Sequence, residues 1–318
     1  MKIAILGLGV IGTTYAYALQ KAGHSLFHIV RESKIKAVPS KISVHLLDGR
    51  NNPKGEEKLD TYDVVLADTD NEFDFILISV ASGKINEAVQ TIKSRKLKGT
   101  IILFCNFWNR RADIERIIGD IPYVTAFPTA GGHLENGLLD CVLFDHIMVE
   151  CQEKCSIPNY DKLMLLLKSA NIKAEIPNDM FEWIWIHMAI NAGVASTAAR
   201  DGSIDNPNQL ARNLMNDSKA LALAVRTIRE TLKVVESRGV NLKLYRNEIL
   251  PYKIPAVLAG IAMKKMFAGN ELTSRIMTLH SDVNDIMYGC KCVYYEAKQQ
   301  GLVLPMFYKN TEKIFGNN

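Results

Sequence analysis

The chain has 318 residues, of which 48% are hydrophobic and 23% charged, with a formal net charge of +4. This length exceeds the size at which a single hydrophobic core usually stops growing, so two domains are expected. The lysines and arginines are dispersed and no zinc-finger or aromatic RNA-binding signature accompanies them, which argues against a nucleic-acid partner.

The first half of the chain alternates short β-branched runs with amphipathic segments, as a parallel α/β architecture requires. Several runs are apolar along their whole length, which is typical of strands covered on both faces. His24 and His28, around the second run, are interpreted as packing or surface groups. The predicted strands span residues 2–7, 25–30, 74–80, 100–106, 123–127 and 146–151.

A glycine-rich turn joins the first predicted strand to a helical pattern and reads Gly7-Leu8-Gly9-Val10-Ile11-Gly12. A bare GxGxxG sequence is weak evidence, but a position between strand and helix is the context that dinucleotide binding needs. Gly7 would allow a tight turn, Gly9 would let the backbone approach a pyrophosphate, and Gly12 would permit close helix packing. The helix N-terminus would supply amide donors for the phosphates. The alternative is a glycine turn with a purely structural role.

The residue after the second strand bears on the identity of the dinucleotide. An NAD site usually has an acid at this distance from the glycine turn, where it binds the ribose hydroxyls. This chain has Arg31 there, and a guanidinium can pair with a 2′-phosphate, so NADP is favoured. In the alternative, Arg31 is solvated and Glu32 binds the ribose.

Strand signals nearly stop after residues 172–177, and long helical periods replace them. One series ends at Gly239, and a second ends before Gly301 and Pro305, which are typical helix-ending residues. The sequence therefore predicts a Rossmann-type dinucleotide-binding domain over residues 1–177 and an all-helical domain over residues 178–318. The apolar positions of the first series are Leu221, Val225, Ile228, Leu232 and Val235.

Cysteine spacing and hydropathy limit the class of protein further. The six cysteines include no CxxC pair, so we expect reduced, mostly buried thiols and no metal site. No uninterrupted apolar stretch approaches the roughly 20 residues that span a bilayer. We therefore expect a cytoplasmic protein with no membrane partner.

The stretch WIWIHMAINAG, residues 183–193, places one histidine and one asparagine in an apolar helix. His187 and Asn191 are four residues apart, so both lie on the same helix face. Judged from this stretch alone, a hydrogen-bonded pair inside a core is the simpler interpretation. The alternative is that the pair forms part of a cleft wall.

Several of these features together resemble the ketopantoate reductase family. They are the N-terminal GLGVIG, the arginine after the second strand, Asn106 at the end of a mid-domain strand, and the helix WIWIHMAIN. The resemblance implies a Rossmann domain and an all-helical domain, with NADPH reducing a 2-oxo acid to a D-2-hydroxy acid in the cleft between them. It covers nearly the whole chain, although Phe107 stands where the family usually has glycine.

The chain departs from the family at positions that carry chemistry. The family helix bears a catalytic lysine and then two asparagines at four-residue intervals, whereas this chain has His187, Asn191 and Ala195. After the strand at 74–80 the family usually has a lysine, whereas this chain has Ala81, with Lys84 three residues later. The replacement of lysine by histidine is the departure that matters most for the reaction.

Other family positions are carried over residue by residue. Asn106 matches an asparagine that contacts nicotinamide and substrate, and Gly131 falls near the cofactor-lining turn. Asp285 aligns with a substrate-binding glutamate but is shorter by one methylene, and Thr273 or Ser274 aligns with the family serine. The resemblance therefore implies a substrate site containing Asn106, Asn191, Ser274 and Asp285.

The implied chemistry is carbonyl reduction. Hydride transfer to a carbonyl carbon leaves negative charge on oxygen, and a nearby acid must supply a proton. Histidine can do so near neutral pH, because its unperturbed pKa is about 6.5. The resemblance thus assigns His187, Asn191 and Asp285 to catalysis, with His187 replacing the family lysine and Asn191 orienting the ring or the substrate oxygen.

We therefore expect an NADPH-dependent reductase of a ketopantoate-like 2-oxo acid. The altered positions suggest a branched or aromatic substrate, while a narrower version keeps ketopantoate itself, with Lys84 and Asp285 compensating for Ala81 and Ala195. An alternative of a different class is a non-enzymatic NADP-binding sensor or scaffold that has lost the lysine chemistry. The apolar helices of the second domain are compatible with a homodimer.

Overall fold

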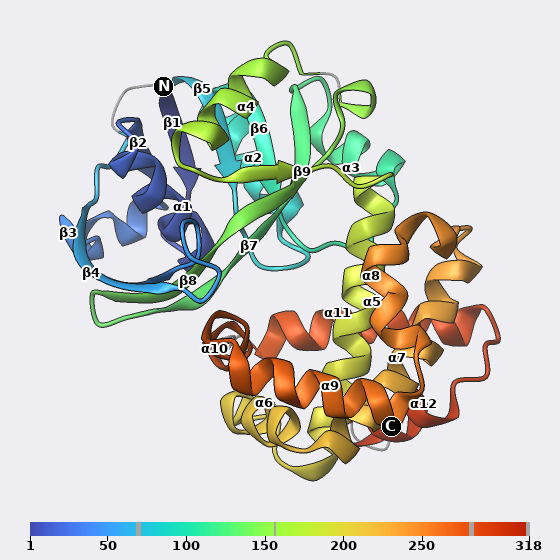
Figure 1. Cartoon of the computed structure of the whole chain (residues 1–318). Helices are drawn as coiled ribbons and strands as arrows, with labels where there is room; N and C mark the ends of the chain where they lie inside the picture. The colour runs from blue at the N-terminus through green and yellow to red at the C-terminus, as the bar shows by residue number, and fades with distance from the viewer. Residues whose placement is uncertain (68–70, 156, 280–282, 316–318) are drawn as a thin grey trace. The chain divides into compact units, whose positions relative to one another are not determined.

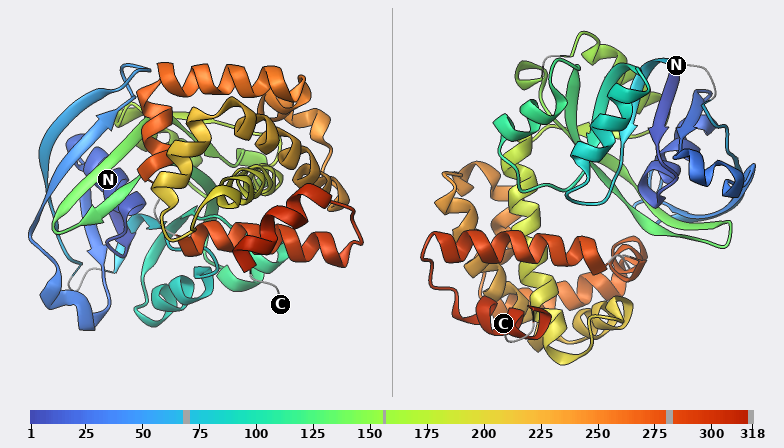
Figure 2. Two further views of the ribbon diagram at one scale, coloured as in Figure 1. Left: turned by 90° about the horizontal axis from the view of Figure 1, so that it is seen from below. Right: turned by 180° about the vertical axis from the view of Figure 1, so that it is seen from behind.

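The computed structural model of the protein describes residues 1–67, 71–155, 157–279 and 283–315 (Figure 1). It contains two compact units, Met1–Met180 and Phe181–Asn318. Figure 2 shows all the strands in the first unit, coloured blue to green, and helices in the second unit, coloured yellow to red. The predicted boundary after residue 177 lies in the same short segment as this division.

The first unit is built on one mixed sheet with the order β2-β1-β5-β6-β7-β8-β3-β4, and β9 pairs with β8. The five strands from β2 to β7 are parallel neighbours, and β8 and β4 run antiparallel to β7 and β3. The strands are β1 Lys2–Leu6, β2 Ser25–Ile29, β3 Lys41–Asp48, β4 Glu56–Asp63, β5 Glu72–Ile78, β6 Lys98–Phe104, β7 Tyr123–Glu135, β8 Leu138–Val149 and β9 Lys173–Glu175.

The sheet is parallel from β2 to β7 and contains antiparallel pairs beyond that point, which the sequence did not predict. β7 continues well beyond the predicted end at residue 127 and forms a long hairpin with β8, and β3 and β4 form a second antiparallel pair. β3 and β4 were not predicted. β4 carries mostly charged residues and buries only Tyr62, so its sequence does not indicate a strand. β3 does have the alternating pattern of a strand, with Ile42, Val44 and Leu46 buried, and was missed. The predicted class of a Rossmann-type α/β domain followed by an all-helical domain is nevertheless confirmed.

Helices of the first unit pack on the sheet, and the sheet curls around one of them. They are α1 Val10–Lys21, α2 Ile85–Ser94, α3 Arg111–Ile118 and α4 Tyr160–Ser169, with short 3-10 turns at Glu32–Ala37 and Gln152–Lys154. In α1 all residues from Gly12 to Leu19 are buried, whereas a helix on a flat sheet buries only one side. Tyr17 and Lys21 of α1 both reach Asp60 of β4, at 3.0 and 2.7 Å. The far end of the sheet therefore closes over α1.

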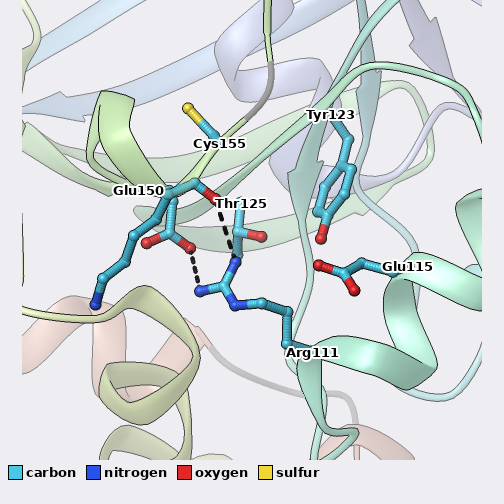
Figure 3. A pocket seen from close by; sticks show the side chains of 7 residues that line it. Arg111, Glu115, Tyr123, Thr125, Glu150 and Cys155 are labelled. Carbon is cyan, nitrogen blue, oxygen red and sulfur yellow. Dashed lines mark hydrogen bonds and ion pairs between the residues drawn. The ribbon is translucent and has the colours of Figure 1, made fainter.

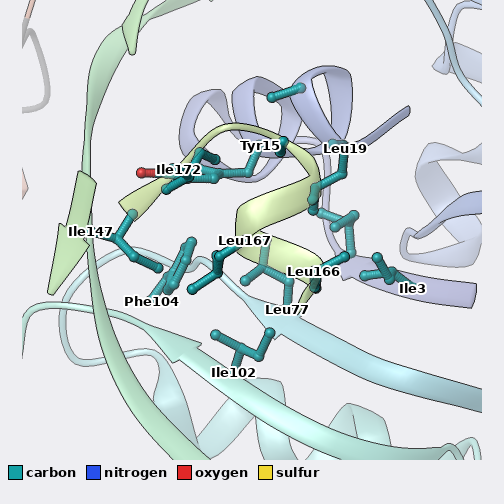
Figure 4. Packing of buried hydrophobic residues seen from close by; sticks show 14 of the residues in the cluster. Ile3, Tyr15, Leu19, Leu77, Ile102, Phe104, Ile147, Leu166, Leu167 and Ile172 are labelled. Atoms are coloured by element: carbon teal, nitrogen blue, oxygen red, sulfur yellow. The ribbon is translucent and has the colours of Figure 1, made fainter. Parts of the chain in front are cut away.

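The core of the first unit lies between this curved sheet, α1 and α4 (Figure 4). Tyr15 packs edge-to-face on Phe104, with ring centroids 5.0 Å apart. Leu166 and Leu167 of α4 are buried in the same cluster. Each such aliphatic side chain contributes about 1.5–3 kcal/mol relative to an exposed position. This packing fixes the strands whose ends carry the candidate site.

A buried carboxylate fastens the start of the β3–β4 hairpin loop to α4. Asp48 is 1% exposed, and its carboxylate accepts hydrogen bonds from the Arg50 guanidinium at 2.8 and 2.9 Å and from Lys58 at 2.7 Å. Arg50 also donates to the Ala170 carbonyl at 2.8 Å. Burial alone would raise the pKa of Asp48, but the hydrogen bonds from Arg50 and Lys58 outweigh it and lower that pKa to about 2.

We expect Asp48→Asn to lower the stability of the first unit by about 2.5 kcal/mol at pH 7. The native pKa lies below the unfolded value, so this stabilisation is complete above pH 4 and is lost as the pH falls from about 4 to about 2. Amide hydrogen exchange in β3 should show this pH dependence in the parent and not in the variant. Asp63→Asn is the control, because the Asp63 carboxylate pairs with Lys41 at an exposed position, and such a pair is worth about 0–1 kcal/mol. Equal losses in both variants would contradict the prediction.

The second unit contains helices and no strand among its described residues. The predicted period of α7 is confirmed, since Leu221, Val225, Ile228, Leu232 and Val235 are all buried. None of the helices that the structure describes is long and apolar enough to cross a membrane. The helices are α5 Met180–Ala198, α6 Pro207–Asn216, α7 Ser218–Ser237, α8 Arg246–Lys253, α9 Ala256–Gly269, α10 Glu271–Leu279, α11 Val283–Gln299 and α12 Pro305–Phe315, with 3-10 turns at Ala199–Asp201 and Leu242–Tyr245.

None of the six cysteines forms a disulfide. Three are buried, and the others are partly exposed. Among the described residues no group of histidine, cysteine or acidic side chains has the geometry of a metal site.

Candidate functional site

The glycine turn leads from β1 into α1. Gly7 has a φ of +91°, a conformation that glycine adopts without strain. A Cβ on Gly12 would lie 2.9 Å from Cγ2 of Ile5, so glycine is needed for the close approach of α1 to β1. Gly9 precedes α1 and is exposed. A Cβ added to Gly9 would have the Ser79 carbonyl oxygen as its nearest neighbour, at 3.8 Å. The space next to Gly9 is therefore open to a ligand.

The start of α1 suits an anion. Its first turn contains no acidic residue, and its N-cap is Gly9, which has no side chain to cap the helix. The amide donors of Val10 and Ile11 and the helix dipole are thus available for a phosphate. This arrangement fits the pyrophosphate of a dinucleotide.

Asn106 lies on the same edge of the sheet as the glycine turn. β1, β5 and β6 are parallel neighbours, so the segments after Leu6, Ile78 and Phe104 meet at one edge. The Oδ1 atom of Asn106 is buried and has no hydrogen-bond partner among the described residues. A buried acceptor without a partner costs free energy, so this atom fits a donor supplied by a ligand, such as a carboxamide N–H.

Arg31 follows β2 and is largely exposed, with 78% of its side chain accessible. Its guanidinium lies 3.8 Å from the Glu87 carboxylate, and Lys84 pairs with that carboxylate at 2.6 Å. Two cations thus share one acid near the start of α2. Glu32, the alternative ribose ligand, is also exposed.

Gly131, which was expected near a cofactor-lining turn, is in a strand. It lies within β7, is buried, and pairs with Val142 of β8. β7 pairs with β6 only as far as Ala126, so Gly131 lies on the part of the hairpin that continues past the end of β6. A cofactor contact at Gly131 stays a prediction.

α5 carries the histidine and asparagine on its most accessible side. His187 is half-buried and Asn191 is exposed, with Nε2 of the imidazole 2.9 Å from Nδ2 of the amide. The Trp183 ring stacks on the imidazole with centroids 5.3 Å apart and an interplanar angle of 9°. Ala195, four residues beyond Asn191, lies on the same side of α5 and is partly exposed. His187, Asn191 and Ala195 thus form one stripe along the helix. The hydrogen bond exists, but the exposure of Asn191 contradicts the interpretation of a pair inside a core.

α11 packs against α5 at the level of this stripe. A Cβ on Gly289 would lie 3.9 Å from Cε of Met188, and the Cys290 thiol donates to the Ala192 carbonyl at 3.9 Å. Asp285 is one turn before Gly289 and is partly exposed. The structure therefore brings the helix of Asp285 beside the helix of His187.

Ser274 lies on α10 and uses its hydroxyl locally. Its Oγ donates to the Glu271 carbonyl at 3.1 Å, while the backbone N–H of Thr273 donates to Oδ1 of Asn270 at the same distance. These contacts are typical of a helix start and do not distinguish Thr273 from Ser274 as the substrate ligand.

A separate polar pocket in the first unit was not predicted (Figure 3). Arg111 binds Glu150 at 3.0 Å and Asp179 at 3.2 Å, and Asp179 also pairs with Lys154. Glu150 is 1% exposed, and burial raises its pKa even though Arg111 opposes the rise. The pocket holds about 60 Å³, which suits ordered water better than a substrate.

The position of Glu150 in the sequence indicates that a cationic partner is needed. An acidic residue that ends the apolar run HIMVE needs a cationic partner. The sequence could not identify Arg111 as that partner, because the contact spans 39 positions along the chain.

The comparisons with known proteins agree with this architecture. Residues 3–136 match the family model described as ketopantoate reductase PanE/ApbA. The resemblance inferred from the sequence is therefore confirmed over β1 to β7. No protein among the curated sequences matches the chain.

Solved structures extend the likeness of the fold to the whole chain. A D-mandelate dehydrogenase in a ternary structure with NADH and anilino(oxo)acetate has a TM-score of 0.65 and 18% identity over 99% of this chain and 97% of its own. A dimeric ketopantoate reductase from Staphylococcus aureus has a TM-score of 0.62 and 16% identity, with 98% and 96% covered. A probable 2-dehydropantoate 2-reductase from Bacillus subtilis has a TM-score of 0.62 and 17% identity, with 99% of each chain covered. Identities this low establish the fold alone.

Proposed function

We propose that the chain is an oxidoreductase that uses a nicotinamide dinucleotide, preferably NADPH, to reduce a ketopantoate-like 2-oxo acid to the D-2-hydroxy acid. The observation that supports this most strongly is the unpartnered Oδ1 atom of Asn106 on the sheet edge that also carries the glycine turn. The match of residues 3–136 to the ketopantoate reductase model supports the same activity. The mandelate dehydrogenase structure, which holds NADH and an oxo-acetate, supports the substrate class.

The residues of the second unit would manage the proton and the carboxylate. Bound NADPH supplies hydride to the carbonyl carbon, and the carbonyl oxygen must then gain a proton. His187 donates that proton, and Asn191 holds the imidazole through the 2.9 Å contact. The acid is the imidazolium form, in which both ring nitrogens carry protons: Asn191 would accept from Nε2–H through its amide oxygen, Nδ1–H would pass its proton to the substrate oxygen, and the ring would be left neutral. Asp285 orients the polar groups of the substrate.

The first test is oxidation of NADPH by the purified protein with ketopantoate, aliphatic 2-oxo acids and aromatic 2-oxo acids, with NADH as the comparison. Turnover with ketopantoate would support the narrow version, in which Lys84 and Asp285 compensate for Ala81 and Ala195. Turnover only with other oxo acids would assign the change in specificity to those positions. Tight NADPH binding without turnover across the panel would overturn the proposal in favour of a non-enzymatic NADP-binding sensor.

We expect Arg31→Ala to raise the KM for NADPH by roughly tenfold and to leave the KM for NADH within about twofold, because only NADPH carries the 2′-phosphate. Glu32→Ala is the matched variant on the adjacent residue, and it should change neither value. Steady-state kinetics with both cofactors measure the effect. If Glu32→Ala instead raises the KM for NADH, Glu32 binds the ribose, and this result would contradict the proposed preference for NADPH.

A homodimer is part of the same proposal. The Staphylococcus aureus reductase is described as dimeric, and α9 of this chain has exposed apolar side chains at Val257, Leu258 and Ile261. The mass of the protein in solution, measured by light scattering, tests it.

A further inference from the structure

A buried histidine lies directly beneath the glycine turn. His28, on β2, is 0% exposed. Its Nδ1 atom is 2.7 Å from the Gly7 carbonyl oxygen, and its Nε2 atom is 2.7 Å from the hydroxyl of Tyr62 on β4. Tyr62 is itself 0% exposed. The interpretation of His28 as a packing or surface group therefore misses its contact with the turn.

The partners of His28 fix its tautomer. A carbonyl oxygen can only accept a hydrogen bond, so Nδ1 must carry a proton. Burial lowers the pKa of His28, although the bond to Gly7 opposes the shift, and the ring is neutral near pH 7. Nε2 then accepts, and the Tyr62 hydroxyl donates to it. Tyr62, His28 and Gly7 thus form a chain of hydrogen bonds with a single direction.

β2 also holds both peptide groups of Gly7. The Gly7 N–H donates to the Ile29 carbonyl at 2.8 Å, while the Gly7 carbonyl accepts from the His28 ring. In a planar trans peptide the C=O of one residue and the N–H of the next point in opposite directions. Directing the Gly7 carbonyl toward the buried ring of His28 therefore directs the Leu8 N–H away from it.

The rolled sheet makes this arrangement rigid. β2 and β4 are at opposite ends of the strand order, yet the Tyr62 hydroxyl reaches His28. The backbone of His28 is fixed as well, because its N–H donates to Val65 at 2.7 Å and its C=O accepts from Ala67 at 3.0 Å. The imidazole consequently has little freedom to follow a moving turn.

We propose that His28 is a positioning residue for the dinucleotide: by holding the Gly7 carbonyl it aims the Leu8 N–H at the pyrophosphate, and Tyr62 holds the opposite edge of the imidazole in place. The inference rests on the proposed dinucleotide binding. It gives a function to His28, which is not part of the GxGxxG sequence.

Two substitutions of His28 distinguish the role of Nδ1 from that of Nε2. In His28→Asn the amide nitrogen falls near the position of Nδ1 and can still donate to Gly7, so NADPH affinity should stay within about threefold. In His28→Gln the amide lies near Nε2 and the Gly7 carbonyl loses its donor, so the dissociation constant should rise by roughly tenfold. Titration of NADPH fluorescence gives both constants.

Tyr62→Phe provides a second variant that keeps both rings. Without the hydroxyl, Nε2 of His28 loses its donor and the ring is held only through Nδ1, so we expect NADPH to bind about threefold more weakly. Nitrogen NMR of the histidine-labelled protein should show the Nδ1–H tautomer in both proteins, because the Gly7 carbonyl still accepts that proton, with the Nε2 resonance shifted in the variant by the loss of its hydrogen-bond donor. Tyr160→Phe is the matched control, because its hydroxyl makes a buried bond to the Glu150 carbonyl away from the turn.

The outcomes are distinct. Weak binding by His28→Gln and Tyr62→Phe, with near-parent binding by His28→Asn and Tyr160→Phe, is the expected result. Parent-like affinity in His28→Gln or Tyr62→Phe would overturn the inference and leave the proposed function intact. Losses in all four variants that follow their melting temperatures would reduce His28 to a structural group and also overturn it. A parent protein that binds neither NADPH nor NADH would overturn the inference and the proposed function together.

Discussion

Replacing His187 with alanine is expected to lower turnover by roughly 10²- to 10⁴-fold while leaving the affinity for NADPH within about twofold of the parent. The imidazole is on the accessible stripe of α5, where it is stacked on Trp183 and hydrogen-bonded to Asn191. Its removal eliminates the proton donor, whereas the glycine turn of the first unit is untouched. Pre-steady-state oxidation of NADPH and equilibrium binding measure the two quantities separately.

Two further variants test whether His187 acts as an acid. His187→Lys restores the side chain that the ketopantoate reductase family resemblance implies, so its turnover should stay within about tenfold of the parent. The turnover of this variant should also persist to higher pH than that of the parent, because an unperturbed lysine stays protonated up to about pH 10. His45→Ala is the matched control, since His45 is on β3, paired with Glu57 and Asp140. Parent-like turnover in His187→Ala would remove His187 from the mechanism.

The local parts of the candidate site could be predicted from the sequence. The turn between β1 and α1 depends on three glycines within six residues, and its context could be read without tertiary information. The stripe of α5 follows from a four-residue interval in one helix. Both features are built by neighbours in the sequence.

The parts that depend on distant pairing could not be predicted. β4 has the sequence EEKLDTYD and buries only Tyr62, so its hydrophobic pattern does not indicate a strand. Because β4 was not predicted, Tyr62 could not be recognised as the partner of His28 Nε2, and the contact of His28 with the Gly7 carbonyl could not be inferred. The position of Gly131 inside β7 could not be predicted either, because the hairpin of β7 and β8 is determined by pairing across strands rather than by local residue types.

The direction of the α5 stripe depends on how α5 packs against α7. Ala189, Gly193 and Thr197 form one face of α5, and successive residues of a helix turn by about 100°. This face therefore lies opposite His187 and Asn191. It is fastened to α7 by two buried hydrogen bonds, from Thr231 Oγ1 to the Ala189 carbonyl at 2.7 Å and from Thr197 Oγ1 to Thr227 Oγ1 at 3.1 Å.

Gly193→Ala is accordingly expected to destabilise the second unit by roughly 3 kcal/mol. The added Cβ would lie 2.7 Å from Cγ1 of Ile228 and 2.9 Å from both its Cα and its backbone nitrogen. Two of these three atoms belong to the backbone, so a side-chain rotation cannot relieve the overlap and the helices must separate. Trimming the neighbour with Ile228→Val should therefore fail to restore stability, and full rescue would contradict the prediction.

The same substitution should also affect the reaction. A displacement of about 1 Å at α5 is enough to lower turnover by roughly 10²-fold when the displaced helix carries the proton donor. Gly269→Ala is the control, because Gly269 ends α9, is exposed and has no atom within 4 Å of an added Cβ. Denaturant unfolding and turnover at a temperature where both variants remain folded separate the two effects. Loss of stability without loss of turnover would show that α5 keeps its direction without close contact to α7, and that Gly193 serves packing alone.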